Sequence, residues 1–179
     1  MNDQAELAAV PRVPPDEEPT FQTFFTTHYE RLARALFLLC GDAGEAEDLA
    51  QEAMVRVYER WSRVSEMSSP EGYLYRTALN LHRSRLRKVV TRRKQRGDQP
   101  SASADPADAA VAGDEVARAL AALPRGQREA VVLVSWLGLS HEEAGRVLQI
   151  EPVSVRSRLS RARAAMRQTL NDDDGDSDA

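Results

Sequence analysis

The segment 139–170, LSHEEAGRVLQIEPVSVRSRLSRARAAMRQTL, constrains the fold most, because it predicts two helices joined by a tight turn. Ser140 can accept hydrogen bonds from the free amides that open the first helix, and Glu143 can complete a capping box with it. Pro152 suits the first turn of the second helix, where its missing N–H costs nothing. The second helix has five arginines and no acid between residues 152 and 170. The pattern is typical of a helix-turn-helix that binds DNA.

The second helix of this motif has two chemically different faces. Apolar residues recur every three or four positions and predict a buried stripe made of Val155, Leu159, Ala162, Met166 and Leu170. The residues predicted to contact DNA are Ser154, Arg156, Ser157, Arg158, Ser160, Arg161 and Arg163. Arginine can donate two parallel hydrogen bonds to guanine, and serine can donate or accept. An ordinary amphipathic helix explains any single arginine but not the whole set.

Helical periodicity extends over the rest of the chain, and no segment has the alternation of a strand, so we expect an all-α protein of two small helical domains. Its predicted parts are a disordered leader (1–19), a first domain (20–94), a flexible linker rich in alanine, serine and aspartate (95–113), a helix-turn-helix domain (114–170) and an acidic tail (171–179). Domains of this size bury a modest share of their surface, so each would be marginally stable alone.

Three helices are predicted in the first domain. The first ends at Gly41, Asp42 can cap the second, and the third follows Pro70 and continues to about Lys94. Residues 62–69 are predicted to form a polar loop that is too short to hold an element of its own.

The net charge of −4 hides a strong sorting of charge along the chain. Residues 83–96 contain eight basic residues and no acid, and the second helix of the motif is similarly basic. Because local charge meets the phosphates, an acidic total does not exclude a nucleic-acid partner.

Composition also bounds the compartment and the chemistry. Cys40 is the only cysteine, which excludes an intramolecular disulfide, and its apolar neighbours predict a buried thiol. No apolar run approaches the length of a membrane span, so we expect a cytoplasmic protein without membrane contact. His28, His82 and His141 lack the spacing of metal ligands, and phosphate loops, nucleophile elbows and paired catalytic carboxylates are missing from the sequence. We therefore expect no metal, no cofactor and no enzymatic activity.

Two sets of residues follow the pattern of a known family. In the C-terminal half they are Leu123-Pro124, Gln127-Arg128, Gly138-Leu139-Ser140, Glu143-Ala144 and the string SVRSRLSRAR at 154–163. Upstream they are EAEDLAQE at 45–52, PEGYLYR at 70–76, and Asn80. The first set resembles region four of bacterial sigma factors and the second resembles region two. Together they cover roughly residues 21–170. Two sigma regions with a short joint and no others is the layout of the extracytoplasmic-function (ECF) group.

The resemblance implies partners and residue roles. An ECF factor binds core RNA polymerase and directs recognition of the promoter −35 and −10 elements; the polymerase is the catalyst. Docking on the clamp coiled coil of the largest polymerase subunit is implied for Asp48, Gln51 and Glu52. Reading of the −10 element, beside the loop 62–69, is implied for Tyr73, Arg76, Asn80, Arg83 and Arg87. The helix-turn-helix domain would bind the −35 element and the polymerase flap. An anti-sigma protein is a further candidate partner, and the free chain is expected to be a monomer.

Some positions depart from the family pattern. Gln149 and Val153 stand where glycine is frequent, and Ser84 stands where aspartate is common. Ala144-Gly145 replaces a more usual isoleucine-alanine pair, which predicts a less tightly packed first helix in the motif.

Two other functions are compatible with the residues. One is a helix-turn-helix regulator that acts without docking on polymerase, but such a regulator would normally dimerise, and we find no heptad or other dimer seam in the sequence. The other is a decoy that sequesters anti-sigma proteins, which would not need Ser154, Arg156 and Arg161 poised for bases.

Overall fold

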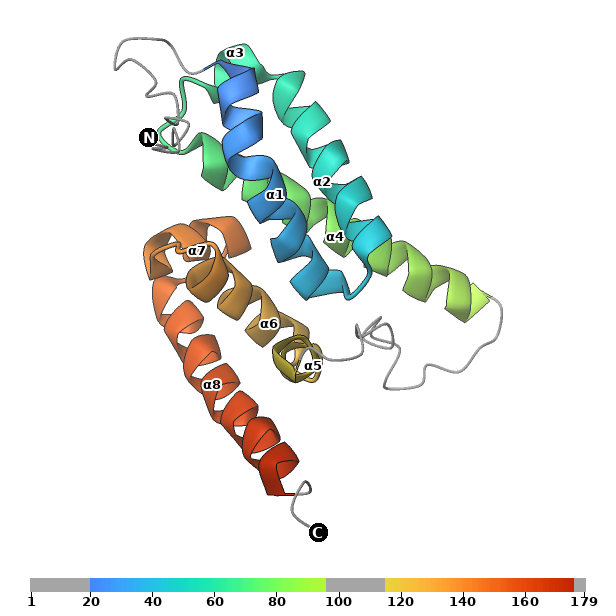
Figure 1. The fold of residues 1–179 in the computed structure, drawn as a ribbon. Helices are drawn as coiled ribbons and strands as arrows, with labels where there is room; N and C mark the ends of the chain where they lie inside the picture. Colours follow the sequence, from blue (N-terminus) through green and yellow to red (C-terminus); the bar gives the residue numbers. More distant parts are fainter. Residues whose placement is uncertain (1–19, 96–114, 176–179) are drawn as a thin grey trace, which may run out of the picture.

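The computed structural model describes residues 20–95 and 115–175, with side chains described for 20–92 and 116–168. Every element in these ranges is helical, which confirms the all-α class (Figure 1). The predicted leader, nearly all of the predicted linker and the last residues of the tail lie outside the described ranges.

The N-terminal region is a small bundle in which α1 and α2 run antiparallel and α4 crosses both (Figure 1). Its helices are α1 (Phe21–Cys40), α2 (Ala43–Tyr58), α3 (Trp61–Val64) and α4 (Pro70–Gln95). Gly41 ends α1 with φ 75°, and its N–H donates to the Phe37 carbonyl. The Asp42 carboxylate accepts from the Glu45 N–H at 2.7 Å and caps α2. Both predicted helix ends are therefore confirmed.

The expected loop 62–69 begins as a helix, so the prediction that it holds no element is wrong. The one-turn α3 closes with a hydrogen bond from the Ser65 N–H to the Trp61 carbonyl, 2.8 Å long. Val64 is completely buried. Burial of this one side chain anchors a turn that local sequence preference does not predict.

The C-terminal region contains the remaining helices: α5 (Glu115–Ala121), α6 (Arg125–Val131), η2 (Val132–Trp136), α7 (His141–Leu148) and α8 (Pro152–Gly175). In the π-helical turn η2, the Leu137 N–H donates to the Val132 carbonyl, five residues back, at 2.9 Å. Helix α8 continues to Gly175, past the predicted start of the tail at residue 171, because no proline or glycine interrupts it earlier.

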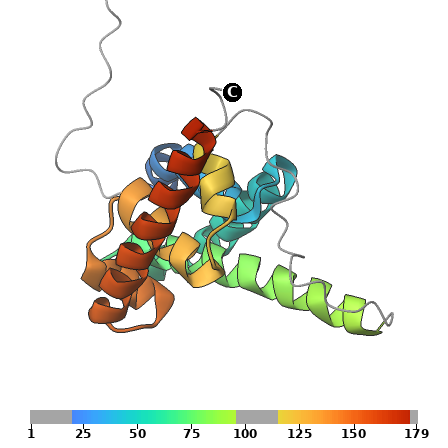
Figure 2. The ribbon, with the colours of Figure 1, turned by 90° about the horizontal axis from the view of Figure 1, so that it is seen from below.

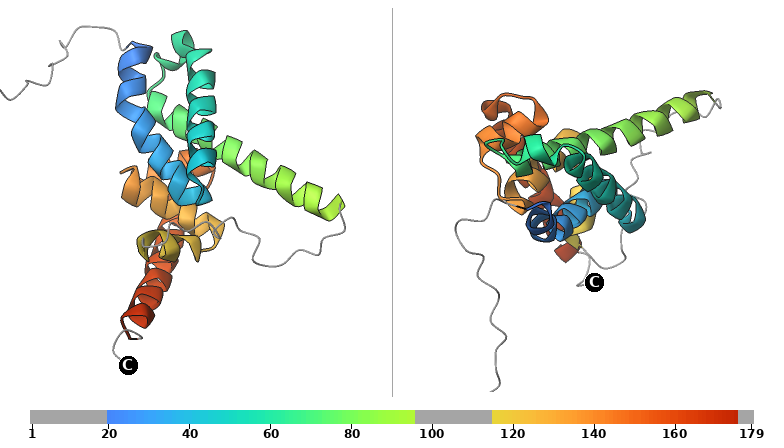
Figure 3. Two further views of the ribbon diagram at one scale, coloured as in Figure 1. Left: turned by 45° about the vertical axis from the view of Figure 1, so that its right-hand side comes forward. Right: turned by 90° about the horizontal axis from the view of Figure 1, so that it is seen from above.

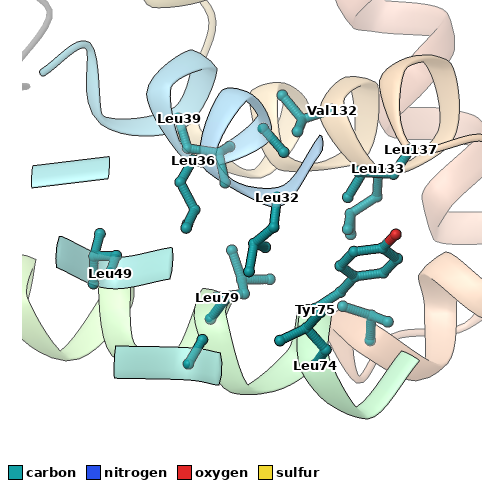
Figure 4. Packing of buried hydrophobic residues seen from close by; sticks show 14 of the residues in the cluster. Leu32, Leu36, Leu39, Leu49, Leu74, Tyr75, Leu79, Val132, Leu133 and Leu137 are labelled. Carbon is teal, nitrogen blue, oxygen red and sulfur yellow. The ribbon is translucent and has the colours of Figure 1, made fainter. Parts of the chain in front are cut away.

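The two regions share one hydrophobic core, although the sequence predicts two tethered domains. Buried residues of α1, α2 and α4 belong to the same cluster as buried residues of α6, η2, α7 and α8. In Figure 4, Leu32 and Leu36 of α1 lie beside Val132, and Tyr75 of α4 lies beside Leu133 and Leu137. A fully buried leucine contributes about 2 kcal/mol through the apolar area removed from water. Each region therefore completes the core of the other.

The shared core sets the shape of the molecule. The bundle of α1 and α2 sits on the C-terminal helices, and the C-terminal half of α4 projects from the body as an arm (Figures 2 and 3). On this arm Val89 and Val90 are about half exposed. The two long basic helices, α4 and α8, leave the core in different directions (Figure 3).

Candidate nucleic-acid interface

The predicted capping box opens α7. The Ser140 hydroxyl accepts from the Glu143 N–H at 3.2 Å, and the Glu143 carboxylate accepts from the Ser140 N–H at 2.8 Å. The hydrogen bond from the Ser140 N–H holds the pKa of Glu143 below its ordinary value, because it favours the ionised carboxylate. The start of the helix-turn-helix is therefore as the sequence predicts.

The turn of the motif depends on Gly145 and Gln149. Gln149 has φ 60° and ψ 46°, a left-handed conformation that favours glycine. A Cβ atom on Gly145 would lie 2.8 Å from the Ile150 carbonyl oxygen, so the chain folds back closely on α7 here. Ala144 is completely buried. The looser packing predicted from Ala144-Gly145 is not found, because the missing side chain permits this close approach.

Helix α8 presents the predicted polar face. Val155, Leu159 and Ala162 are buried as predicted, Met166 is half-buried, and the Leu170 side chain lies outside the described residues. The predicted DNA-contacting residues divide into an exposed group, Arg156, Ser160, Arg161 and Arg163, and a half-buried group, Ser154, Ser157 and Arg158. The Arg161 guanidinium donates to the Ser157 hydroxyl at 2.7 Å. This bond orients one guanidinium fork across the outer face of the helix.

A basic groove of about 670 Å³ runs along α8. Its lining includes the predicted residues Arg156, Ser160 and Arg163, together with His141 and Arg167, which the prediction left out. His141 begins α7 and comes close to α8 only through the fold of the motif. Its position in the sequence gives no sign of this. Arg167 follows Arg163 by one helical turn, so the periodicity could have identified it.

The predicted −10 residues lie on one face of α4, because their positions are three or four apart. Arg76, Asn80 and Arg87 are exposed, and Tyr73 is half-buried. Tyr75 belongs to the core with 3% exposure, and burial raises the pKa of its hydroxyl. The structure therefore separates the two tyrosines and leaves Tyr73 as the one beside the exposed face.

Arg83 is placed differently from the other predicted −10 residues. Its Nε and Nη2 atoms donate to the Glu129 carboxylate oxygens at 3.1 and 2.6 Å, a contact between residues 46 apart in the sequence. Arg125 donates to the same carboxylate at 2.9 Å. Burial alone would raise the pKa of Glu129, but the two arginines outweigh it and hold this pKa below its ordinary value. Glu129 was not predicted, because an isolated acid in a helix does not indicate a partner beyond a linker.

The predicted polymerase-binding residues occupy the outer face of α2. Asp48 and Gln51 are exposed, whereas Glu52 is half-buried and accepts from Arg56 at 2.7 Å and from Arg85 at 3.3 Å. Such pairs contribute little stability at a surface, but they partly neutralise Glu52. The same face carries two apolar side chains that the prediction missed, Val55 at 55% exposure and Tyr58 at 64%.

An aromatic cluster supports the loop beside the −10 face. Trp61 of α3 lies 5.5 Å from Phe21 and 5.0 Å from Phe24, measured between ring centroids. Tyr58 lies 4.9 Å from Phe21. Aromatic pairs at these separations contribute beyond their buried area. The cluster fixes α3, and with it the start of the loop, against the beginning of α1.

Residues 20–95 and 115–175 contain no group of three or more histidine, cysteine or acidic side chains that could hold a metal ion. Across the same ranges, none of the helices is long and apolar enough to cross a membrane. Cys40 is buried, as predicted; burial raises its pKa to about 11, against a hydrogen bond to the Asp42 carbonyl that lowers it.

Comparison with known families agrees with this arrangement. The family described as Sigma-70 region 2 matches residues 24–93, and the family described as Sigma-70, region 4 matches residues 113–166. The RNA polymerase sigma-E factor of Streptomyces coelicolor is 30% identical over 155 residues, which cover 84% of this chain and 85% of that protein. The ECF RNA polymerase sigma factor SigC of Mycobacterium tuberculosis is 35% identical over 138 residues, 74% of each chain.

Two solved structures have the same fold. The sigma factor RpoE of Bartonella quintana, in complex with the anti-sigma factor NepR, has a TM-score of 0.70 at 22% identity and covers 84% of this chain and 96% of its own. CnrH, in complex with the cytosolic domain of CnrY, has a TM-score of 0.61 at 25% identity and covers 86% and 88%.

The helix-turn-helix and the second basic helix thus belong to a transcription initiation protein with two recognition regions. The chain is a member of the sigma-70 family and, within it, an ECF-type sigma factor with regions 2 and 4. It directs promoter recognition and transcription initiation and has no catalytic role of its own. The predicted function is confirmed, and the regulator and decoy alternatives are not supported.

Proposed function

We propose that α8 reads the −35 element through Arg156, Ser157 and Arg161. The observation that carries this proposal is the capped motif whose outer face bears four exposed arginine and serine side chains beside a basic groove. Exposed guanidinium groups suit guanine edges, and the groove suits the phosphates on either side. Arg158 and Arg163, at the margins of the face, are assigned to phosphate contacts, and Ser154 and Ser160 to bases or phosphates.

We further propose that the exposed face of α4 reads the −10 element with the loop that follows α3. Arg76, Asn80 and Arg87 are exposed there, with Tyr73 beside them. Base extrusion costs a few kcal/mol, so a fixed pocket wall is required to offset it. The aromatic cluster around Trp61 supports this wall by holding the loop in place.

For the polymerase, the proposal is that α2 docks on the clamp coiled coil through Asp48, Gln51 and Glu52, and that the helix-turn-helix domain contacts the flap. The exposed side chains of Val55 and Tyr58 extend the α2 face and supply apolar area next to the acids. A charged rim around an apolar centre is typical of protein interfaces. We expect a monomer in the cytoplasm when the chain is free.

An anti-sigma protein is the further proposed partner, because the structural relative RpoE was solved with the anti-sigma factor NepR. A groove of about 710 Å³ between the two regions offers a site for an apolar helix. It is lined mostly by apolar side chains, Phe37, Leu38, Leu120, Val131 and Trp136 among them, with Arg34 and Arg163 also in its lining. A helix with an apolar face and acidic flanks fits this lining.

Run-off transcription with core RNA polymerase tests the assignment of α2. The charge reversal Asp48→Arg should reduce holoenzyme formation and transcript yield together, with an unchanged circular dichroism spectrum. Glu30→Arg is the matched control, because Glu30 is also an exposed acid but lies on α1 and not on α2. Equal loss in both variants would show that total charge, and not this face, governs docking.

A further inference from the structure

A buried ion pair joins the two regions of the chain. Arg83 lies on α4 in region 2, and Glu129 lies on α6 in region 4. The two side chains meet at 2.6 Å in a two-pronged geometry, with the carboxylate 3% exposed and the arginine 24% exposed. A buried carboxylate without a partner would carry a large desolvation cost. The ion pair therefore favours the arrangement of the two regions in which Arg83 stays on Glu129.

Two other arginines cross the same junction. The buried Arg128 side chain of α6 donates to the Leu39 carbonyl of α1 at 3.0 Å. From the opposite side, Arg31 of α1 donates to the Trp136 carbonyl at the end of η2, at 3.3 Å. These bonds and the shared core hold region 4 on region 2 in one defined orientation.

The pair lies in a recess of about 360 Å³ where residues of both proposed DNA faces meet. Arg83 and Arg87 come from the −10 set, Arg158 comes from the −35 set, and Arg125 is the fourth arginine that lines the recess with Glu129. Four guanidinium groups and one carboxylate leave a strongly positive recess, which suits a phosphate group. In the folded chain the carboxylate of Glu129 is the anion in this recess.

We propose that Glu129 takes the place of a DNA phosphate on Arg83, so that the closed arrangement of the regions and the binding of promoter DNA by Arg83 exclude one another. The free sigma factor is then self-inhibited without an anti-sigma partner. Promoter binding must separate Arg83 from Glu129, which loosens region 4 from region 2. This inference rests on the proposed DNA contact of Arg83, and its two halves are tested separately.

Closure is tested on the full-length protein without DNA, by small-angle X-ray scattering. Arg83→Gln removes the ion pair between the regions and leaves Glu129 paired with Arg125, so region 4 keeps its internal bond. Its radius of gyration should rise above that of the wild type. Arg125→Gln is the matched control, because it takes an arginine from the same carboxylate without breaking the link between regions, and its radius should not rise. Equal radii in all three proteins would show that the ion pair does not hold the regions closed, and would overturn the proposal.

Inhibition is tested by the fluorescence anisotropy of a labelled random-sequence duplex, because phosphate contacts do not depend on sequence. Apparent affinity scales with the fraction of open chains, so Glu129→Gln should bind about threefold to tenfold more tightly at low salt. Glu142→Gln makes the same charge change on an exposed residue of α7 and should change binding by less than about twofold. Equal gains in both variants would overturn the inhibitory role.

The outcomes also separate the inference from the proposed function. If Arg83→Gln expands the free protein and still opens promoters normally in the holoenzyme, Arg83 does not contact DNA, and Glu129 does not compete with DNA for it. The ion pair would then only hold the two regions together. If Glu129→Gln does not fold, as judged by circular dichroism, the scattering comparison of Arg83→Gln with Arg125→Gln still decides whether the ion pair holds the regions together.

Discussion

Helices α4 and α8 are the two long basic helices of this chain, and they hold their arginines in different ways. On α8, Arg156, Arg161 and Arg163 are exposed, and Arg156 and Arg163 line a groove. On α4, Arg83 is bound to Glu129, and Arg85 contacts Glu52 and Asp48. The number of arginines in a helix therefore overstates the charge that it offers to DNA. Folding has paired Arg83 and Arg85 of α4 with acids and has left the exposed arginines of α8 available to DNA.

The largest effect is expected in the shared core. Leu36→Ala should destabilise the protein by about 2 to 5 kcal/mol, because Leu36 is 2% exposed and the cavity would be surrounded by fixed neighbours. Chemical denaturation followed by circular dichroism, and by the fluorescence of variants that keep only Trp61 or only Trp136, measures this loss, because the two tryptophans lie in separate regions. Both signals should shift together. If the Trp136 signal keeps its wild-type midpoint, the two regions are independent after all.

Arg161→Ala should weaken −35 binding by about 1 to 3 kcal/mol if the side chain contacts a base, and should relax preference at that base pair. Closed-complex formation by holoenzyme on a promoter and on its single-base variants gives this value. Arg146→Ala, which removes an exposed arginine of α7 that is not among the proposed DNA contacts, serves as control. Equal losses at every base pair would indicate a phosphate contact in place of a base contact.

Asn80→Ala should affect promoter opening more than binding, because Asn80 is exposed on the proposed −10 face of α4. Saturating holoenzyme should give fewer permanganate-reactive thymines, with a loss of about 1 to 3 kcal/mol in the opening equilibrium, as for one specific base contact. Arg161→Ala, assayed at the same saturation, should open normally. Normal opening by the Asn80 variant would remove Asn80 from the −10 face.

Acid should release the two regions from each other. The pKa of Glu129 lies below its ordinary value of 4.5 in the folded chain, so its pairing stabilises the closed form above that value and is lost as the pH falls through the lower, folded-state pKa. Thermal unfolding of the wild type should therefore lose stability below pH 4.5 more steeply than that of Glu129→Gln. Parallel pH profiles would show that other carboxylates control acid unfolding.

The smallest effect is expected for the exposed pairs on α2. Glu52→Gln should change stability by less than about 1 kcal/mol, because its partners Arg56 and Arg85 are themselves substantially exposed. High salt should remove most of the difference between the variant and the wild type. A larger loss of stability that persists at high salt would mean that the pair of Glu52 and Arg85 holds α2 and α4 together. Arg85 would then be a further arginine of α4 that is held within the fold.

Much of the candidate site could be predicted because it is local. The capping box of Ser140 and Glu143 and the buried stripe with Val155 and Leu159 follow from spacing within one helix. The turn at α3 was missed because its stability comes from the burial of Val64. The tolerance of Gln149 for a left-handed turn and the need for Gly145 beside Ile150 also depend on the packed motif.

By itself the sequence determined the long helices, the caps at Gly41, Asp42 and Ser140, the helix-turn-helix and the sorting of positive charge, because these depend on neighbours within a few residues. Only the tertiary structure decided that Leu36 and Val132 share a core and that Arg83 meets Glu129, 46 residues away. Contacts across a linker gain their energy from apolar burial and ion pairing in three dimensions, and no periodicity along the chain encodes them. That pairing divides the basic residues into those exposed to a partner and those held within the fold.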